Sequence, residues 1–262
     1  MTTTKTAPVV MTTIESPPAG AFTVHLVAVG DPPSPALLAG WEMLGVRPLA
    51  VAAPDPGTNA PCLLFAPLVR GFVRAGLTQP FHGFIERGEG SEALSPGCVA
   101  AIRQGGLALS LTTRAASELD LAKVLVAAVG DRFGTASHIL GRLELVLAEA
   151  ISNAIIHGNL GISSEDRSTL EGVQAFHAVM AERLADPVLA ARRIELAVLK
   201  KGATLTLTLS DHGQGYDLAR ALERMPTVSD KFGRGLALIR WLSHSVTAAD
   251  SGRTLVVTFD LG

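Results

Sequence analysis

The sequence has few cysteines, no long apolar run and no marked excess of one charge. Its two cysteines, Cys62 and Cys98, are too few and too unpatterned for a disulfide framework or a zinc site. No apolar run approaches the roughly 18 residues needed to cross a bilayer. The formal net charge of −2 is spread about evenly over the two halves, which argues against a nucleic-acid-binding surface. These absences predict a cytoplasmic protein that binds neither nucleic acid nor membrane.

The length of the chain suits two modest domains. The 262 residues are 48% hydrophobic, so a sizeable core can form. Residues 1–20 are rich in Thr and Pro and lack an apolar signal core, and we expect them to form a disordered tail. We expect an α/β fold in two domains, residues 21–105 and residues 106–262, with the boundary near Gly105 and Gly106.

The first half alternates between strand-like and helix-like segments. Apolar runs predict strands over residues 22–30, 46–53 and 62–69, and a helix is expected over residues 35–44. This β-α-β rhythm is typical of a small domain with a parallel sheet. Residues 83–97 are rich in Gly and Glu and are expected to form a loop, which would also place His82 in a loop.

A row of polar residues lies along an otherwise apolar helix in the second half. Glu149, Asn153 and His157 are spaced four residues apart within the mainly apolar segment Leu140–Ile156, so they share one helix face. The amide oxygen of Asn153 is a hard ligand suited to Mg²⁺, and the Glu149 carboxylate could orient or deprotonate an attacking hydroxyl. The alternatives are ordinary polar residues on a half-exposed helix and, for His157, a cap at the helix end.

A glycine-containing turn follows a predicted hairpin. Residues 193–199 and 204–210 alternate in hydrophobicity, which predicts two half-buried strands. Asp211 ends the second strand, and Gly213 and Gly215 allow the backbone to turn sharply against a ligand. A carboxylate at that point can accept a hydrogen bond from an exocyclic amine such as that of adenine. The alternative is a plain surface loop.

A second glycine turn opens a helix. Gly233, Arg234 and Gly235 precede the apolar-periodic segment Leu236–Leu242. The free N–H groups and the dipole of a helix N-terminus favour phosphate, and Arg234 could add a charge-assisted contact. The pattern is neither a P-loop nor a Rossmann fingerprint, because no Gly-Lys-Ser/Thr follows and no βαβ unit opens there.

Taken in order, the three motifs resemble the N box and the two glycine boxes of the GHKL ATPase superfamily. The segment Glu149–Gly158 is most similar to that of bacterial anti-sigma-factor serine kinases, and the resemblance covers about residues 106–262. It implies an α+β two-layer sandwich of the histidine-kinase-like (Bergerat) type that binds ATP with Mg²⁺. It assigns Glu149 as the catalytic base and Asn153 as the Mg²⁺ ligand. The implied nucleotide-binding residues are Asn153, His157, Asp211, Gly213, Gly215, Gly233, Arg234 and Gly235.

Two segments depart from the compact members of that family. Residues 161–192 form an insertion that is expected to be helical, beginning at a capping box from Ser168 to Glu171 and broken at Asp186-Pro187. Residues 217–232 lie between the glycine boxes and could form a lid over the nucleotide.

The first domain, in front of such an ATPase, resembles a receiver domain. A phosphorylatable receiver needs acids after its first strand and an Asp at the end of its third. Here Asp31 stands alone and residues 62–69 carry no acid, so a degenerate receiver-like domain is expected that accepts no phosphate. The alternative is an unrelated α/β regulatory domain.

Three functions remain open at this point. The first is a serine/threonine kinase that acts on an anti-anti-sigma-like protein partner or holds a sigma factor. The second is a non-catalytic, nucleotide-dependent binding module. The third is a histidine-kinase-like phosphotransfer protein, which is disfavoured because no pair of amphipathic helices with a phosphoacceptor His precedes residue 106. The partner is expected to be a protein, and a homodimer stays open.

Overall fold

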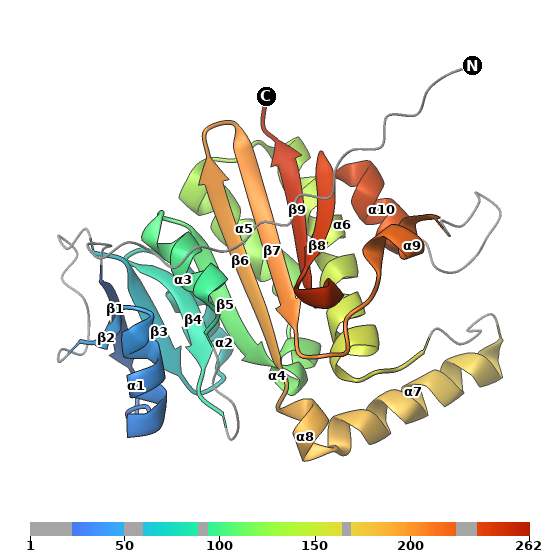
Figure 1. Ribbon diagram of the computed structural model, residues 1–262, viewed down its shortest axis with the longest axis horizontal. Helices are drawn as coiled ribbons and strands as arrows, with labels where there is room; N and C mark the ends of the chain where they lie inside the picture. The colour runs from blue at the N-terminus through green and yellow to red at the C-terminus, as the bar shows by residue number, and fades with distance from the viewer. Residues whose placement is uncertain (1–22, 50–59, 89–93, 164–168, 224–234) are drawn as a thin grey trace.

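The computed structural model describes residues 23–49, 60–88, 94–163, 169–223 and 235–262. The described residues form one nine-stranded sheet in the order β2-β1-β3-β4-β5-β6-β7-β9-β8 (Figure 1). The tail expected over residues 1–20 and the turn residues Gly233 and Arg234 lie outside the described residues. Among the described helices, none combines the length and apolar character needed to span a membrane.

The first five strands of this sheet are parallel. They are β1 (Val24–Ala28), β2 (Val46–Pro48), β3 (Cys62–Ala66), β4 (Phe81–Glu86) and β5 (Leu107–Thr112). Their order, 2-1-3-4-5, is that of flavodoxin-like doubly wound sheets. The strands expected from the apolar runs of the first half are therefore confirmed where they are described.

The remaining four strands are antiparallel. They are β6 (Arg193–Lys201), β7 (Thr204–Asp211), β8 (Ser245–Ala249) and β9 (Thr254–Asp260). The predicted hairpin between β6 and β7 is confirmed, and Gly202 makes its turn with a φ of +59°. Strand β5 is parallel to β4 on one side and antiparallel to β6 on the other. The sheet consequently runs without a break past Gly105 and Gly106, where the boundary between two domains is expected.

Helices cover the two faces of the sheet unequally. Helices α1 (Pro35–Met43) and α3 (Pro96–Arg103) pack on one face, and each begins at a serine cap followed by proline. The other face is covered by α2 (Arg70–Leu77), α4 (Thr113–Glu118), α5 (Leu121–Phe133) and α6 (Ser137–Asn153). Strands β7 and β9 alternate between buried and half-exposed residues, so the sheet there is covered on one face only. This part of the chain is a two-layer α/β sandwich (Figure 1).

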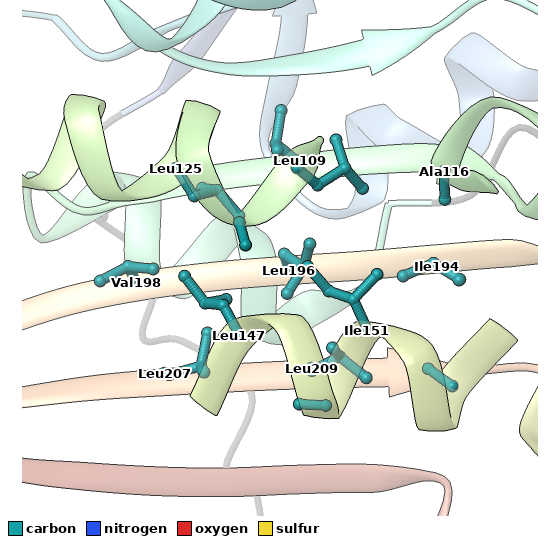
Figure 2. Packing of buried hydrophobic residues seen from close by; sticks show 14 of the residues in the cluster. Leu109, Ala116, Leu125, Leu147, Ile151, Ile194, Leu196, Val198, Leu207 and Leu209 are labelled. Carbon is teal, nitrogen blue, oxygen red and sulfur yellow. The ribbon is translucent and has the colours of Figure 1, made fainter. Parts of the chain in front are cut away.

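Helix α6 joins the core through an apolar stripe. Leu143, Leu147, Ile151 and Ala154 are all buried, as the spacing predicts. In Figure 2, Leu147 and Ile151 of α6 and Leu125 of α5 lie beside the sheet residues Leu196 and Leu209. The α-helix ends at Asn153, however, and the chain continues as a π-helical segment, η1 (Ala154–Asn159), rather than as an α-helix to Ile156.

The loop expected over residues 83–97 is wrong at its two ends. Residues 83–86 belong to β4, which also contains His82, and α3 begins at Pro96. Residues 87–88 and 94–95 belong to no helix or strand, as the prediction expects. A glycine occupies position 83 in the strand because a side chain would collide with the Ala108 carbonyl and would lie 2.7 Å from Leu63 Cδ2. Its glycine therefore reflects the close approach of neighbouring strands and not a turn.

The insertion contains two helices, α7 (Leu170–Ala185) and α8 (Pro187–Ala190), separated at Asp186 as predicted. The side chain of Thr169 caps α7 by accepting a hydrogen bond from Gly172 N, so the expected cap at Ser168 is one residue too early. Of the α7 side chains, all of which are described, Phe176 alone is buried. Helix α7 extends along the edge of the molecule (Figure 1).

Buried polar side chains join the parallel and antiparallel parts of the sheet. Arg193 of β6 is 1% exposed and lies 3.8 Å from the carboxylate of Glu86 on β4. The same carboxylate accepts a 2.6 Å hydrogen bond from Thr112 N. Glu195 of β6 reaches the start of α3, where it accepts a 2.6 Å bond from Ser95 N. Burial raises the pKa of Glu195, and this hydrogen bond opposes the shift.

Candidate functional site

A cavity of about 270 Å³ opens between the end of α6, the end of β7 and the start of helix α10 (Gly235–Leu242). Segment η1 and the 3-10 turn η2 (Asp250–Gly252) complete its wall. Five residues expected at a nucleotide site line this cavity: Asn153, His157, Asp211, Gly215 and Gly235. The structure thus brings together residues that lie up to 82 positions apart (235 − 153) in the chain.

The polar row on the helix follows one side of the cavity. Asn153 is half-buried and ends α6. Glu149 lies one turn earlier and is also half-buried, but it does not line the cavity. A Cβ placed on Gly235 would lie 2.5 Å from Glu149 Oε2 and 3.5 Å from Asn153 Nδ2. The missing side chain of Gly235 therefore lets the Glu149 carboxylate approach the start of α10 closely.

His157 has a structural contact as well as a place in the cavity wall. Its side chain is exposed, and its Nδ1 lies 2.6 Å from the carbonyl oxygen of Ile162, just beyond the end of η1. A ring N–H donating to that carbonyl fixes the chain that leaves the helix. The capping alternative for His157 thus has a direct contact in the structure, and its place in the lining keeps a binding role open.

Asp211 ends β7 and points into the other end of the cavity. Its Oδ1 accepts a 2.8 Å hydrogen bond from Gly213 N, and its own N–H donates to Arg253 O at 3.0 Å. Burial raises the pKa of this carboxyl, and the Gly213 hydrogen bond and the nearby Arg253 oppose the shift. One oxygen of the Asp211 carboxylate thus accepts a hydrogen bond within the turn, and the residue also lines the cavity.

Close backbone packing around Asp211 explains several glycines. A Cβ on Gly158 would lie 2.6 Å from the carboxyl carbon of Asp211, and a Cβ on Gly213 would collide with the Gly158 carbonyl. Gly215 has a φ of +75° and packs against the Ser251 carbonyl. Gly213 does not line the cavity, so its part is to let the turn close against η1.

The phosphate side of the expected site is described in part. Gly235 is the first described residue of α10 and lines the cavity, and a helix that begins here would offer free N–H groups to a ligand. Gly233 and Arg234 lie outside the described residues, as do residues 224–232 of the expected lid. Within the described part, helix α9 (Leu218–Glu223) occupies the start of that segment.

Sequence reasoning assigned no role to three residues that shape the site. Tyr216 and Arg253 line the cavity, and burial together with the Asp211 carboxylate raises the pKa of Tyr216 to about 12. Asn159 is fully buried directly behind the Asp211 turn. Asn159 and Tyr216 directly follow Gly158 and Gly215 of the motifs, so their positions offered a signal, whereas Arg253 follows no recognisable pattern.

A comparison with protein-family models identifies residues 111–259 as a histidine kinase-like ATPase domain. The match spans more than half of the chain, and the chain therefore belongs to this family of GHKL-type ATP-binding domains. None of the curated proteins compared with the chain matches it. Members of the family bind ATP, typically with Mg²⁺.

The residues of the cavity suit ATP with Mg²⁺. The cavity combines an apolar wall, formed in part by Leu209 and Leu255, with a carboxylate at one end. At the other end Asn153 and Gly235 line the cavity, and the Glu149 carboxylate packs against Gly235. Oxygen ligands of this kind suit Mg²⁺, and helix N-termini suit phosphate.

Proposed function

We propose that the chain is an ATP-dependent serine/threonine kinase. We infer that it can also bind its protein partner while ATP occupies the site. Asp211 accepts a hydrogen bond from the exocyclic amine of adenine, and Asn153 is a ligand of Mg²⁺. Glu149 acts as the base that orients or deprotonates the attacking hydroxyl. The partner that best fits the resemblance is an anti-anti-sigma-like protein or a sigma factor.

The position of Glu149 is the observation that carries the kinase proposal. Its carboxylate lies next to Gly235 at the start of α10, where phosphate is expected. Glu149 does not itself line the cavity, but Ala150 and Asn153 on the same helix do. A half-buried group in this place can meet a hydroxyl that arrives from outside.

Histidine-kinase chemistry gains no support from the described residues. His25 and His82 lie in β1 and β4, and His138 lies in the first turn of α6. The helices described before β5 have 9, 8 and 8 residues and pack on a parallel sheet, so they do not form a dimerising hairpin. The non-catalytic binding module remains the second candidate because a closed base pocket would serve it equally well.

The first half of the chain is proposed to be a degenerate receiver-like unit with a regulatory role. Its strand order supports this relationship. Asp31 follows β1 and pairs with Arg87 at 3.4 Å, and β3 ends at Ala66 without an acid. We therefore expect acetyl phosphate to leave residues 23–105 unmodified, as read by intact-protein and peptide mass spectrometry.

The kinase proposal is tested with the full chain, radiolabelled Mg-ATP and a purified anti-anti-sigma protein. Acid-stable label on a serine or threonine of that protein is the expected result. Glu149→Ala should retain ATP affinity within about threefold and lose roughly 10²–10⁴ in transfer rate. Asn153→Ala should lower both ATP affinity and rate, because the metal joins the phosphates to the protein.

Three outcomes separate the candidate functions. Loss of transfer with retained ATP binding in Glu149→Ala supports the kinase. ATP-dependent capture of the partner without any label, equal in parent and Glu149→Ala, favours the binding module. Acid-labile label on the chain itself would favour histidine-kinase chemistry. Thermal unfolding, monitored by circular dichroism, must show that each variant folds as the parent does.

A further inference from the structure

We propose that Asn159 is a positioning residue for the base pocket: its buried amide clamps the backbone directly after Asp211 and thereby sets the nucleotide preference of the site. The inference rests on the proposed nucleotide-binding function, and it concerns a residue that lies outside the cavity lining. Asn159 is the last residue of the π-helical segment η1 and is fully buried.

Both N–H groups of this amide donate hydrogen bonds, and its oxygen accepts one. Nδ2 donates to Thr113 Oγ1 at 2.8 Å and to the Arg193 carbonyl at 3.0 Å, while Oδ1 accepts from His212 N at 2.7 Å. The Thr113 hydroxyl in turn donates to Arg192 O at 2.9 Å, so it accepts from the amide. The pattern of donors and acceptors fixes the orientation of the amide group.

The backbone of Asn159 is held as firmly as its side chain. The Arg192 guanidinium donates a 2.6 Å hydrogen bond to the Asn159 carbonyl oxygen. The preceding residue, Gly158, packs its Cα against the Asp211 carboxyl group, and its carbonyl contacts Gly213. The end of η1 therefore packs closely against the turn after β7.

The bond to His212 N is the one that bears on the pocket. His212 directly follows Asp211, and Gly213 N holds Asp211 Oδ1, so the clamp acts at the centre of a three-residue turn. Without an acceptor at this point, the partly buried His212 N–H loses its partner within the protein, and the turn can rotate to find another. Rotation of that turn would redirect the Asp211 carboxylate, whose direction decides which base edge it meets.

The other two amide bonds point away from the pocket, which provides a matched control. Thr113 begins α4, and its hydroxyl lies on the far side of the amide from His212. Thr113→Val removes a buried partner of Asn159 and leaves the acceptor for His212 N in place. It should destabilise the fold without altering the turn, whereas Asn159→Leu removes the acceptor itself.

The test compares three full-chain variants by calorimetric titration with Mg-ATP and Mg-GTP. Asn159→Leu should bind ATP at least tenfold more weakly and reduce the ATP-to-GTP preference at least tenfold. Asn159→Asp keeps an acceptor oxygen for His212 N and should retain the parental preference, although its charge lowers the melting temperature. Thr113→Val should also retain the preference. Should Asn159→Leu not fold, Asn159→Ser, which cannot reach His212, takes its place with the same expectation.

A second readout needs no nucleotide. Hydrogen exchange of a peptide covering residues 209–216, measured by mass spectrometry, should accelerate at least tenfold in Asn159→Leu and remain unchanged in Thr113→Val. Parental preference and parental exchange in Asn159→Leu would overturn the positioning role. Failure of the parent to bind ATP would instead overturn the proposed function, and the exchange experiment would still decide whether the clamp exists.

Discussion

Removing the Glu86 carboxylate should strongly destabilise the protein. Glu86 is 8% exposed, and its carboxylate faces Arg193, which is 1% exposed, and accepts two hydrogen bonds from Thr112. Glu86→Ala leaves the Arg193 charge buried without its carboxylate and deprives Thr112 N of its acceptor. Removing one partner of a buried ion pair typically costs about 3–5 kcal/mol.

Part of that cost is offset by contacts that survive the substitution. Arg193 also donates to the carbonyl oxygens of Ser110 at 3.2 Å and of Glu86 at 2.8 Å, and both remain in the variant. We therefore expect the free energy of unfolding to fall by about 3 kcal/mol, near the lower end of the range. Glu86→Gln keeps an acceptor for Thr112 N but also removes the charge opposite Arg193. It should therefore be less destabilising than Glu86→Ala only by the retained hydrogen bond, about 1 kcal/mol.

Urea unfolding followed by circular dichroism and by the fluorescence of buried Trp41 measures these changes. The matched control is Asp31→Ala, which removes the Arg87–Asp31 ion pair, whose Asp31 side chain is 95% exposed. That control should change stability by no more than about 0.5 kcal/mol. If Glu86→Ala proves no more destabilising than Asp31→Ala, the buried pair does not stabilise the junction of the sheet.

Two further substitutions probe acid stability and the base pocket. Burial lowers the pKa of His82 to about 4. Below about pH 6.5 the unfolded chain therefore binds a proton at His82 that the folded protein does not bind. Stability should thus be lost as pH falls from about 6.5 to 4, and His82→Gln should flatten that dependence in urea titrations at pH 7 and 5. Gly158→Ala puts a Cβ 2.6 Å from the Asp211 carboxyl carbon and should weaken ATP binding at least tenfold in calorimetry. Gly141→Ala, a helical site with nothing within 4 Å, should stabilise the fold and leave binding unchanged, and equal affinities in the two variants would contradict the role given to Gly158.

The parts of the fold that local periodicity dictates could be predicted from the sequence. The apolar stripe of α6, the β6–β7 hairpin and the start of α10 at Gly235 all follow from spacing and glycine positions within short segments. Strand β9 alternates between buried and half-exposed residues, so the sequence also contains a signal for this strand.

Features that depend on distant neighbours could not be predicted in this way. Gly83 marks a strand and not a loop because Ala108 and Leu63 approach it from other strands. The transition from α-helix to π-helix after Asn153 likewise has no marker in the local pattern. In each case the deciding contact joins segments that the sequence does not place side by side.

The candidate site shows the same division. Asn153, Asp211 and Gly235 could be selected because each lies in a recognisable motif, and the cavity brings them together. The partners of Asn159 lie 34, 46 and 53 residues away along the chain, so no local pattern could reveal its contacts. The roles of Glu149 and Asn153 in chemistry are predictions that Glu149→Ala and Asn153→Ala test directly.

Because strand β5 belongs to both parts of the sheet, the position at which the chain is cut matters for any shortened protein. A fragment that begins at residue 106 would carry β5 without β4 beside it, leaving a row of unpaired backbone groups flanked by Leu107, Leu109 and Leu111. Such an uncovered apolar edge is a template for association with another copy. Aggregation of that fragment would therefore reflect the exposed edge and would say nothing about the integrity of the nucleotide pocket.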